Sequence, residues 1–562
     1  MEREKRDKEL ETLPAPAEPT TAILRLDLLR TYKLAWLRRD LIAGLVIFAV
    51  TIPAALAYGQ LAGVQPINGL YASLLGMVIY AFFGTSRHLI IAAEPAVAII
   101  VFSSMASVAA GADPARFATL VMIEALLVGG IQVLAGLTHV GLIADFIPKS
   151  VVVGFLNGMA LIIIMAMAGN ITGIELSQTD FLPRVLEFYA NMHRAHHLTL
   201  IMGGSCLLGL LLCRLFFRFL PDAVVVAGLA TGAVIWWNLG AQGVHLVGSV
   251  PAGLPHPGLP PISFEDIVTL FPIAMGVALV SFVDTTITGR AFAMRGGYQL
   301  DHDQELIALG LANVGNGLFQ GFAVGASHSR TAVNMMYGGR SQFAGLVATG
   351  LLAVFLLHFT SILRNVPVVA LSAIIVAAGV RILDPKEVFR IWRTRPASAY
   401  ISIITTFAVL IAGLMIGILV AVAFAIILVM HRLSRPHETI LRPKVPGAGL
   451  LVYRFAGPLF FFNASYFFNR VQNIVEAANP PVNFFLINAE AIVDIDINAA
   501  EILEELYHYL RRRNITLGIC EAKGHFRTVL LSTSLTTRPG FNLYPNVDSL
   551  VQELNKQPTK ED

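Results

Sequence analysis

Between residues 41 and 431 the chain is a succession of apolar stretches separated by short polar, glycine- or proline-containing connections. A helix needs about 20 predominantly apolar residues to cross a bilayer. The pattern predicts fourteen membrane helices, several of them too short to span unaided: 41–63, 69–84, 91–109, 116–137, 146–173, 198–218, 222–239, 267–290, 303–320, 331–338, 342–362, 366–381, 398–412 and 415–431. We expect the final apolar run, Ala399 to Met430, to fold as two short helices around Gly413 and Gly417.

Composition supports a membrane domain. Hydrophobic residues make up 56% of the chain and charged residues 14%, whereas soluble proteins carry about 25% charged residues. Polar sequence is concentrated at the two ends, so we divide the chain into a cytoplasmic N-terminal segment (1–39), a transmembrane domain (40–433) and a C-terminal soluble domain (446–556). The net charge of +3 gives no indication of nucleic-acid binding. The three cysteines have no metal-ligand spacing, and no metal site is predicted.

The basic residues of short loops predict the orientation, because Lys and Arg favour the cytoplasmic side. Arg38 and Arg39 precede the first predicted helix, and a group of basic residues follows the twelfth. The loop 241–264 contains neither Lys nor Arg. We therefore expect a multi-pass protein of the cell membrane with both termini in the cytoplasm and this loop outside.

The same loop separates two halves of seven predicted helices, about 40–240 and 265–433. An odd number in each half inverts the second relative to the first, an arrangement from which many transporters build a site near the membrane midplane. Each half contains a short interrupted helix, one beginning at Glu94 and Pro95 and the other near Ser327. The N-terminus of a half-helix has free backbone N–H groups and the positive end of its dipole, so two of them facing each other would bind an anion.

Two groups of motifs carry a resemblance. The first half contains Asp40, Ile52-Pro53, Ala57-Tyr58, Leu61-Ala62-Gly63-Val64, Gly69-Leu70-Tyr71-Ala72 and Phe83-Gly84-Thr85-Ser86-Arg87-His88. The second half contains Gln304-Glu305-Leu306, Asn313, Ser329-Arg330-Thr331-Ala332-Val333-Asn334 and Gly339-Arg340-Ser341-Gln342. With these motifs the chain resembles the sulfate permease (SulP) family of anion transporters. The resemblance implies a seven-plus-seven inverted repeat of core and gate domains, a substrate held between the third and tenth half-helices, elevator-like movement of the core against the gate, and a homodimer.

The tenth half-helix carries the candidate anion site. A guanidinium at membrane depth is costly and marks a functional position, so we expect Arg330 to supply the positive charge near the substrate, beside the Ser329 hydroxyl. A structural ion pair of Arg330 with Glu94 or Asp284 is the alternative. His328 is a polar residue of the same turn and a second candidate for substrate contact or for a proton.

Two acids are candidates for the coupling ion. The resemblance places an acid near the substrate in the eighth helix, where Asp284 is followed by Thr288 one turn later. A carboxylate with nearby hydroxyls can ligate Na⁺, and a desolvated one can hold a proton. Glu94 and Ala96, in the first turn of the third half-helix, are further substrate candidates, and Glu94 also a coupling candidate. Two carboxylates against the Arg330 guanidinium leave one net negative charge, so an anion joining them needs a compensating cation.

The C-terminal domain alternates strand-like and helical segments and is predicted to be a small α/β domain. Val493-Asp494-Ile495-Asp496 and the helix after it resemble the STAS domain (sulfate transporter and anti-sigma factor antagonist). In STAS regulators a phosphorylated serine follows the residue equivalent to Asp496, but Ile497 and Asn498 stand here. We therefore expect no phosphoswitch and a structural role or a cytoplasmic protein partner.

Taken together, the sequence predicts a symporter, coupled to H⁺ or Na⁺, for sulfate, bicarbonate or a small dicarboxylate. No cofactor is expected beyond that coupling ion. An anion exchanger is the first alternative, followed by an anion channel or voltage-driven motor and by a nucleobase permease. No enzyme motif occurs, and we expect no catalysis.

Overall fold

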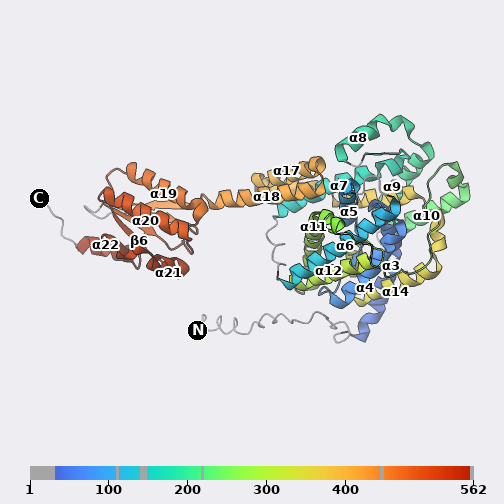
Figure 1. Cartoon of the computed structure of the whole chain (residues 1–562), viewed down its shortest axis with the longest axis horizontal. Helices are drawn as coiled ribbons and strands as arrows, with labels where there is room; N and C mark the ends of the chain where they lie inside the picture. Colours follow the sequence, from blue (N-terminus) through green and yellow to red (C-terminus); the bar gives the residue numbers. More distant parts are fainter. Residues whose placement is uncertain are drawn as a thin grey trace. The chain divides into compact units, whose positions relative to one another are not determined.

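The computed structural model describes residues 32–108, 113–139, 148–178, 180–216, 221–443 and 449–556. The chain forms two compact units, Met1–Val422 and Ala423–Asp562. The first contains nearly all of the apolar helices and the second a five-stranded sheet (Figure 1). Each unit is described by itself.

Every predicted apolar stretch corresponds to a helix, so the helical part of the fold is confirmed. The first half contains α3 (Leu37–Leu61), α4 (Pro66–Phe83), α5 (Pro95–Val108), α6 (Pro114–Leu137), α7 (Lys149–Thr172), α9 (His197–Phe216) and α10 (Asp222–Trp237). The second half contains α11 (Phe264–Gly296), α12 (His302–Leu318), α13 (His328–Met336), α14 (Phe343–His358), α15 (Val368–Ile382), α17 (Pro396–Ala412) and α18 (Leu414–Leu433). Within the described residues, seven helices are long and apolar enough to cross a membrane.

The break in the last apolar run lies where it was predicted. Helix α17 ends at Ala412 and α18 begins at Leu414. Gly413 between them has a φ of 84°, a left-handed conformation that glycine adopts without steric cost. The chain can therefore turn within one residue.

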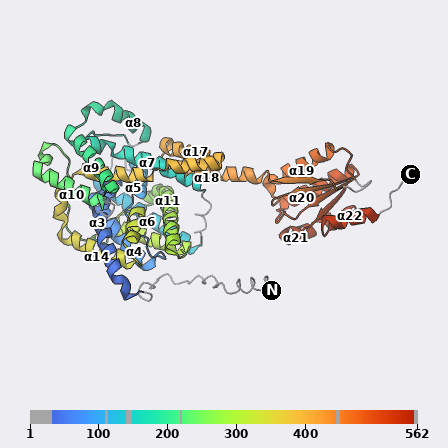
Figure 2. The same cartoon turned by 180° about the vertical axis from the view of Figure 1, so that it is seen from behind.

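The helices pack in two groups, seen from opposite sides in Figure 1 and Figure 2. The core group consists of α3 to α6 and α11 to α14, and α6 packs closely along α12. A Cβ on Gly129 would lie 2.5 Å from the carbonyl oxygen of Gly310, so small residues permit this close crossing. The gate group consists of α7, α9, α10, α15 and α17. The two groups meet where α3 and α5 face α7, α10 and α15.

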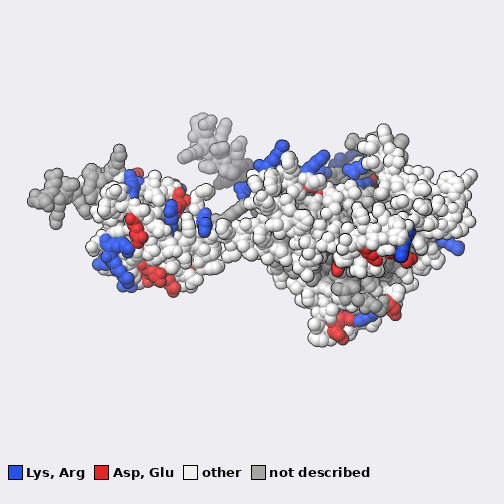
Figure 3. All heavy atoms as spheres, turned by 90° about the horizontal axis from the view of Figure 1, so that it is seen from above, with Lys and Arg blue, Asp and Glu red and all other residues white. Residues whose placement is uncertain are grey.

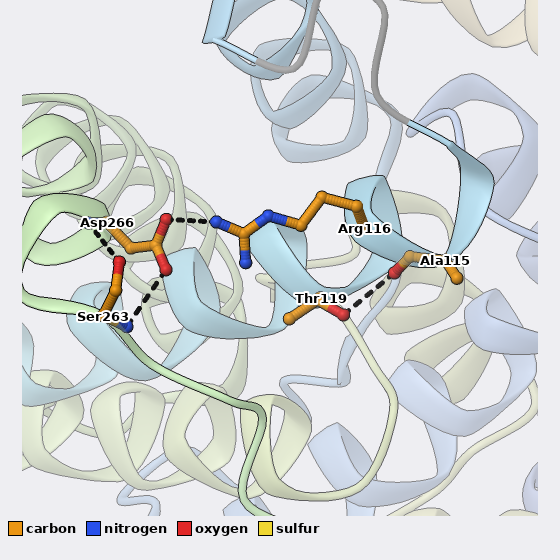
Figure 4. A network of polar contacts seen from close by, with 5 residues as sticks. All are labelled: Ala115, Arg116, Thr119, Ser263 and Asp266. Atoms are coloured by element: carbon orange, nitrogen blue, oxygen red, sulfur yellow. Dashed lines mark hydrogen bonds and ion pairs between the residues drawn. The ribbon is translucent and has the colours of Figure 1, made fainter.

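A polar contact joins the two halves at one end of the core group. Arg116 Nη2, in the first turn of α6, donates to Asp266 Oδ1 of α11 at 2.5 Å (Figure 4). Asp266 also forms a capping box with Ser263, in which each backbone N–H donates to the other side chain at 3.1 Å. Most of the face of the first unit in Figure 3 is otherwise uncharged, as expected of a surface that contacts lipid.

Two additional helices were not predicted. They are α8 (Phe181–Ala190), which follows α7, and α16 (Pro385–Thr394), which follows α15. Helices α7 and α15 are the fifth and twelfth predicted helices, so α8 and α16 occupy corresponding places in the two halves. Both are short and amphipathic, and a search for long apolar runs does not detect such helices.

A two-stranded antiparallel sheet also went unpredicted. Strand β1 (Ile91–Ala92) pairs with β2 (Gly325–Ala326), with Ile91 opposite Ala326 and Ala92 opposite Gly325. Helices α5 and α13 begin within three residues of these strands. The pairing therefore brings the N-termini of the two half-helices together.

The second unit is an α/β domain whose sheet has the order β3-β4-β5-β6-β7. Its strands are β3 (Glu438–Leu441), β4 (Leu450–Phe455), β5 (Phe484–Asn488), β6 (Thr516–Cys520) and β7 (Phe541–Tyr544), all parallel except β3. Helices α19 (Phe461–Glu476), α20 (Ile497–Arg512) and α21 (Gly524–Ser532) pack on one face, and α22 (Val547–Lys556) on the other. The predicted α/β class is confirmed.

Candidate functional site

The two half-helices begin with different caps. Glu94 Oε2 accepts a hydrogen bond from the Ala96 amide at 2.7 Å, so a carboxylate caps α5. Ser327 Oγ accepts from the Arg330 amide at 3.4 Å, so a hydroxyl caps α13. The amides of His328 and Ser329, in the first turn of α13, precede any intrahelical acceptor. The N-terminus of α13 therefore keeps more of its positive potential than that of α5.

Arg330 lies behind this turn and is completely buried. Its Nη2 donates to the carbonyl oxygen of Ala93, directly before α5, and its Cζ lies 6.0 Å from the centre of the Tyr58 ring. No ion pair joins Arg330 to Glu94 or Asp284 within 4 Å, so the structural alternative is not observed among these residues. Nε and Nη1 have no hydrogen-bond partner. A guanidinium buried at membrane depth with two of its nitrogens unpaired has capacity for a further acceptor.

The structure brings the coupling candidates beside the anion candidates. Thr288 Oγ1 donates to the backbone oxygen of Asp284 at 2.7 Å and lies 2.8 Å from His328 Nε2, which links α11 to α13. Asp284 is only 8% exposed, and its Oδ2 has no hydrogen-bond partner. A buried carboxylate in a membrane has a large desolvation cost if it is charged and unpaired.

A cavity of about 860 Å³ connects these residues. Its inner end is lined by most of the predicted site residues: Glu94, Ala96, Asp284, His328 and Ser329. Arg330 and Thr288 do not line it, so the guanidinium of Arg330 lies behind the cavity wall and not at its surface. At its other end the cavity reaches the ends of α9, α10 and α15, where Arg381 and Asp222 form an ion pair.

Tyr58 is a site residue that the sequence reasoning missed. It lies on α3, lines the cavity and lies within cation–π distance of Arg330. The available signal was its place in the motif Ala57-Tyr58. That motif supported the resemblance, but no role was drawn from it.

The other motif residues hold the segments before the half-helices. Glu305 on α12 accepts hydrogen bonds from Tyr80 Oη and from the backbone N–H of Thr85, at 2.7 and 2.8 Å. Asn313 Oδ1 accepts from the Val324 amide at 2.7 Å, just before β2, and its Nδ2 donates to Gln132 Oε1 at 2.8 Å. The bonds of Glu305 to Tyr80 and Thr85 and the bond of Asn313 to Gln132 join the two halves, whereas the bond to Val324 lies within the second. Such buried polar bonds fix the half-helix N-termini in place.

The segments are held from the α13 side as well. Asn334 Nδ2 donates to the backbone oxygen of His88 at 2.9 Å, and the Ser327 amide donates to that of Ile90 at 2.9 Å. Asp40 Oδ1, at the start of the first-half motif, accepts from the amide of Arg340 at 2.6 Å. The first residue of one motif group thus contacts the last motif of the other.

In the second unit, Asp496 caps α20. It accepts from the Ala499 amide at 2.8 Å and from the Phe461 amide at 2.7 Å. Ile497 follows it with an exposed side chain that has no hydroxyl. Nearby, the pKa of Asp494 is lowered by its hydrogen bond with His525 at 2.7 Å. Neither residue 497 nor residue 498 has a hydroxyl group that could be phosphorylated. The absence of a phosphoswitch therefore stays a prediction.

The paired half-helices, their buried polar supports and the cavity between two helix groups define a membrane transport protein. Residues 37–405 match the sulfate permease family and residues 440–550 match the STAS domain. The chain belongs to the sulfate permease family, and it is a multi-pass membrane anion transporter rather than an enzyme.

Known relatives agree with this assignment. The chain is 36% identical over 526 residues to a probable sulfate transporter of Mycobacterium tuberculosis, covering 91% of this chain and 94% of the relative. It is 28% identical to the chloroplastic sulfate transporter 4.1 of Arabidopsis thaliana, covering 87% and 76%.

Solved structures show the same fold. The structure of SLC26A9 matches with a TM-score of 0.86 at 20% identity, covering 99% of this chain and 94% of that one. The transmembrane domain of a cyanobacterial bicarbonate transporter, BicA, matches with a TM-score of 0.62 at 21% identity, covering 70% and 98%.

Proposed function

We propose that this chain is a secondary active transporter that carries sulfate in symport with a proton. The proposal rests on the surroundings of Asp284. Its carboxylate is buried on the cavity wall, and its Oδ2 has no hydrogen-bond partner. A carboxylate in this place repels an anion unless a cation neutralises it. The substrate and the coupling ion are thereby linked at one site.

The anion is proposed to bind at the N-terminus of α13. The amides of His328 and Ser329, the Ser329 hydroxyl and the charge of Arg330 converge there. Backbone N–H groups at a helix N-terminus are well suited to a tetrahedral oxyanion. Sulfate is favoured over bicarbonate or a dicarboxylate because two relatives that are 36% identical to the chain are described as probable sulfate transporters.

A proton is favoured over Na⁺ as the coupling ion. Na⁺ needs several oxygen ligands arranged around it, and the Thr288 hydroxyl beside Asp284 already donates to a backbone carbonyl and faces the His328 ring. A proton needs only the carboxylate. Na⁺ remains the alternative that the experiment below distinguishes.

Transport is proposed to occur by movement of the core group against the gate group. One side of the cavity is formed by α3, α5, α11 and α13, and the other by α7, α9, α10 and α15. With the orientation predicted from the basic loops, its mouth at Arg381 and Asp222 faces the cytoplasm. The homodimer and the cell membrane location remain proposals that rest on the family resemblance.

Uptake by the purified chain in liposomes tests the proposal. Labelled sulfate, bicarbonate and fumarate are each supplied with an inward pH gradient, an inward Na⁺ gradient, or an anion trapped inside. We expect concentrative uptake of sulfate driven by the pH gradient alone. Uptake that requires only a trapped anion would contradict symport and establish an exchanger, and dissipative flux without any coupling would indicate a channel.

A further inference from the structure

Helix α16 presents a face of exposed basic and aromatic side chains. Lys386, Arg390 and Arg393 are exposed, and the side chains of Phe389 and Trp392 are 57% and 39% exposed. Arg393 Cζ lies 4.7 Å from the centre of the Phe389 ring. Aromatic rings with cations beside them are typical of helices that lie in the interface between lipid headgroups and hydrocarbon.

The opposite face of α16 is attached to the gate group. Lys149 Nζ, at the start of α7, lies 2.7 Å from Glu387 Oε1. Asn157 Oδ1, also on α7, accepts from the Asp384 amide at 2.8 Å, just before α16. The side of the helix that bears Glu387 is therefore directed toward the protein, while Lys386 and Arg393 remain exposed without an ion pair among the described residues.

The position of α16 identifies what covers its exposed face. Only two residues separate it from α15 before it and one from α17 after it, and both neighbours are apolar helices of the transmembrane domain. The helix must therefore lie at the level where these helices leave the bilayer. Trp392 stacks edge-to-face on Tyr400 of α17, with ring centres 5.1 Å apart, which extends the aromatic belt onto the membrane helix.

Helix α8 provides a comparison at the corresponding place in the first half. It also exposes a large apolar face, with Leu182, Leu186 and Tyr189 at helical spacing. Its single cation, Arg184, is turned inward and donates to the backbone oxygen of Ala166 at 3.0 Å. A cationic exposed face is thus a property of α16 and not of interfacial helices of this fold in general.

We propose that the exposed face of α16, formed by Lys386, Phe389, Arg390, Trp392 and Arg393, binds anionic phospholipids. Lys386 and Arg393 contact the headgroup phosphates, and the two aromatic rings lie among the upper acyl chains. Arg390, which is paired with Glu387 at 2.5 Å, adds positive charge to this face. Helix α16 is bonded to α7 and is joined to α15 and α17 by very short connections. Lipid bound to α16 therefore fixes the position of the gate group in the membrane. This consequence for transport rests on the proposed function, whereas the binding itself does not.

Lipid titration of the full chain in detergent tests the binding without any transport. Thermal unfolding is followed while phosphatidylglycerol or phosphatidylcholine is added. We expect phosphatidylglycerol to raise the melting temperature saturably and phosphatidylcholine to have little effect. In the double variant Lys386→Gln/Arg393→Gln, half-saturation should require about thirtyfold more phosphatidylglycerol, since each interfacial cation contributes about a factor of five to six.

The matched control is Arg512→Gln/Arg527→Gln, which removes two exposed cations from the α/β domain and should titrate like the wild type. Raising the ionic strength should weaken the wild-type effect, a measurement that needs no variant. The proposal is overturned if phosphatidylcholine stabilises equally, if the α16 variant titrates like the wild type, or if soluble glycerol phosphate reproduces the effect.

Uptake assays then separate the two proposals. Loss of uptake in every vesicle would contradict the proposed function. Uptake at the same rate with and without phosphatidylglycerol would contradict the role of lipid in holding the gate group.

Discussion

Half-helix α5 begins with a carboxylate, whereas half-helix α13 begins with hydroxyls followed by a guanidinium, although both start beside the same strand pair. On α5, the Glu94 carboxylate accepts a hydrogen bond from the Ala96 amide and adds a negative charge. On α13, Ser327 caps with a neutral group, and the buried Arg330 adds a positive charge. Under the proposed function, the N-terminus of α13 binds the anion, and the N-terminus of α5 supplies a negative charge that regulates this binding.

This asymmetry teaches that the fold alone does not decide what is bound. Two helix N-termini would favour an anion from both sides. We propose that the carboxylates Glu94 and Asp284 oppose that tendency and make anion binding dependent on a cation.

Arg330→Ala should remove the anion site on α13. The change deletes the charge behind the turn and the bond to the Ala93 oxygen, and a hydrogen bond to a charged group contributes about 1.5–3 kcal/mol. We expect sulfate affinity to fall about a hundredfold, measured as equilibrium binding of labelled sulfate to the purified chain. Arg330→Lys, which keeps the charge, is the control and should retain part of the affinity. Equal affinity of Arg330→Ala and wild type would contradict a role of this charge.

Glu94→Gln should make the two half-helices more alike. Glutamine keeps an oxygen to accept from the Ala96 amide but removes the negative charge. Because a like charge no longer opposes the anion, we expect sulfate binding to become roughly tenfold tighter and less dependent on pH. Glu94→Ala separates the two effects, since it also loses the cap, worth about 1 kcal/mol. Weaker binding in both variants would show that Glu94 contacts the substrate favourably.

Arg116→Ala should have the smallest effect and leave the comparison intact. Arg116 is 43% exposed and pairs with Asp266 at the far end of the core group (Figure 4). Loss of a partly exposed pair should lower the free energy of unfolding by about 1 kcal/mol or less, measured by thermal unfolding in detergent. Sulfate affinity and coupling should stay at wild-type values. A change in coupling would mean that this contact takes part in transport.

Much of the helical fold could be predicted from the sequence, because each membrane helix corresponds to a local run of apolar residues. Gly413 and Pro95 likewise act locally, the first through its left-handed conformation and the second at the start of α5. The starts of both half-helices could therefore be located, and with them Glu94 and Ser329.

What could not be predicted depends on pairings between distant residues. The β1–β2 register joins Ile91 to Ala326, and Glu305 accepts from Thr85 across the two halves. No local pattern encodes such partners. The inward direction of Arg330, toward Ala93 and away from the cavity surface, is also a consequence of packing. Helices α8 and α16 were not predicted because they are short and amphipathic.

Coupling of the anion to a proton through Asp284 is the main step of the proposed function. It is tested most directly by measuring proton flux, with a pH-sensitive dye inside liposomes, when an inward sulfate gradient is imposed. We predict that sulfate acidifies the wild-type vesicles in the absence of Na⁺, and that Asp284→Asn abolishes acidification while still binding sulfate. Acidification at the wild-type rate in Asp284→Asn, or sulfate entry into wild-type vesicles without any proton flux, would contradict the account.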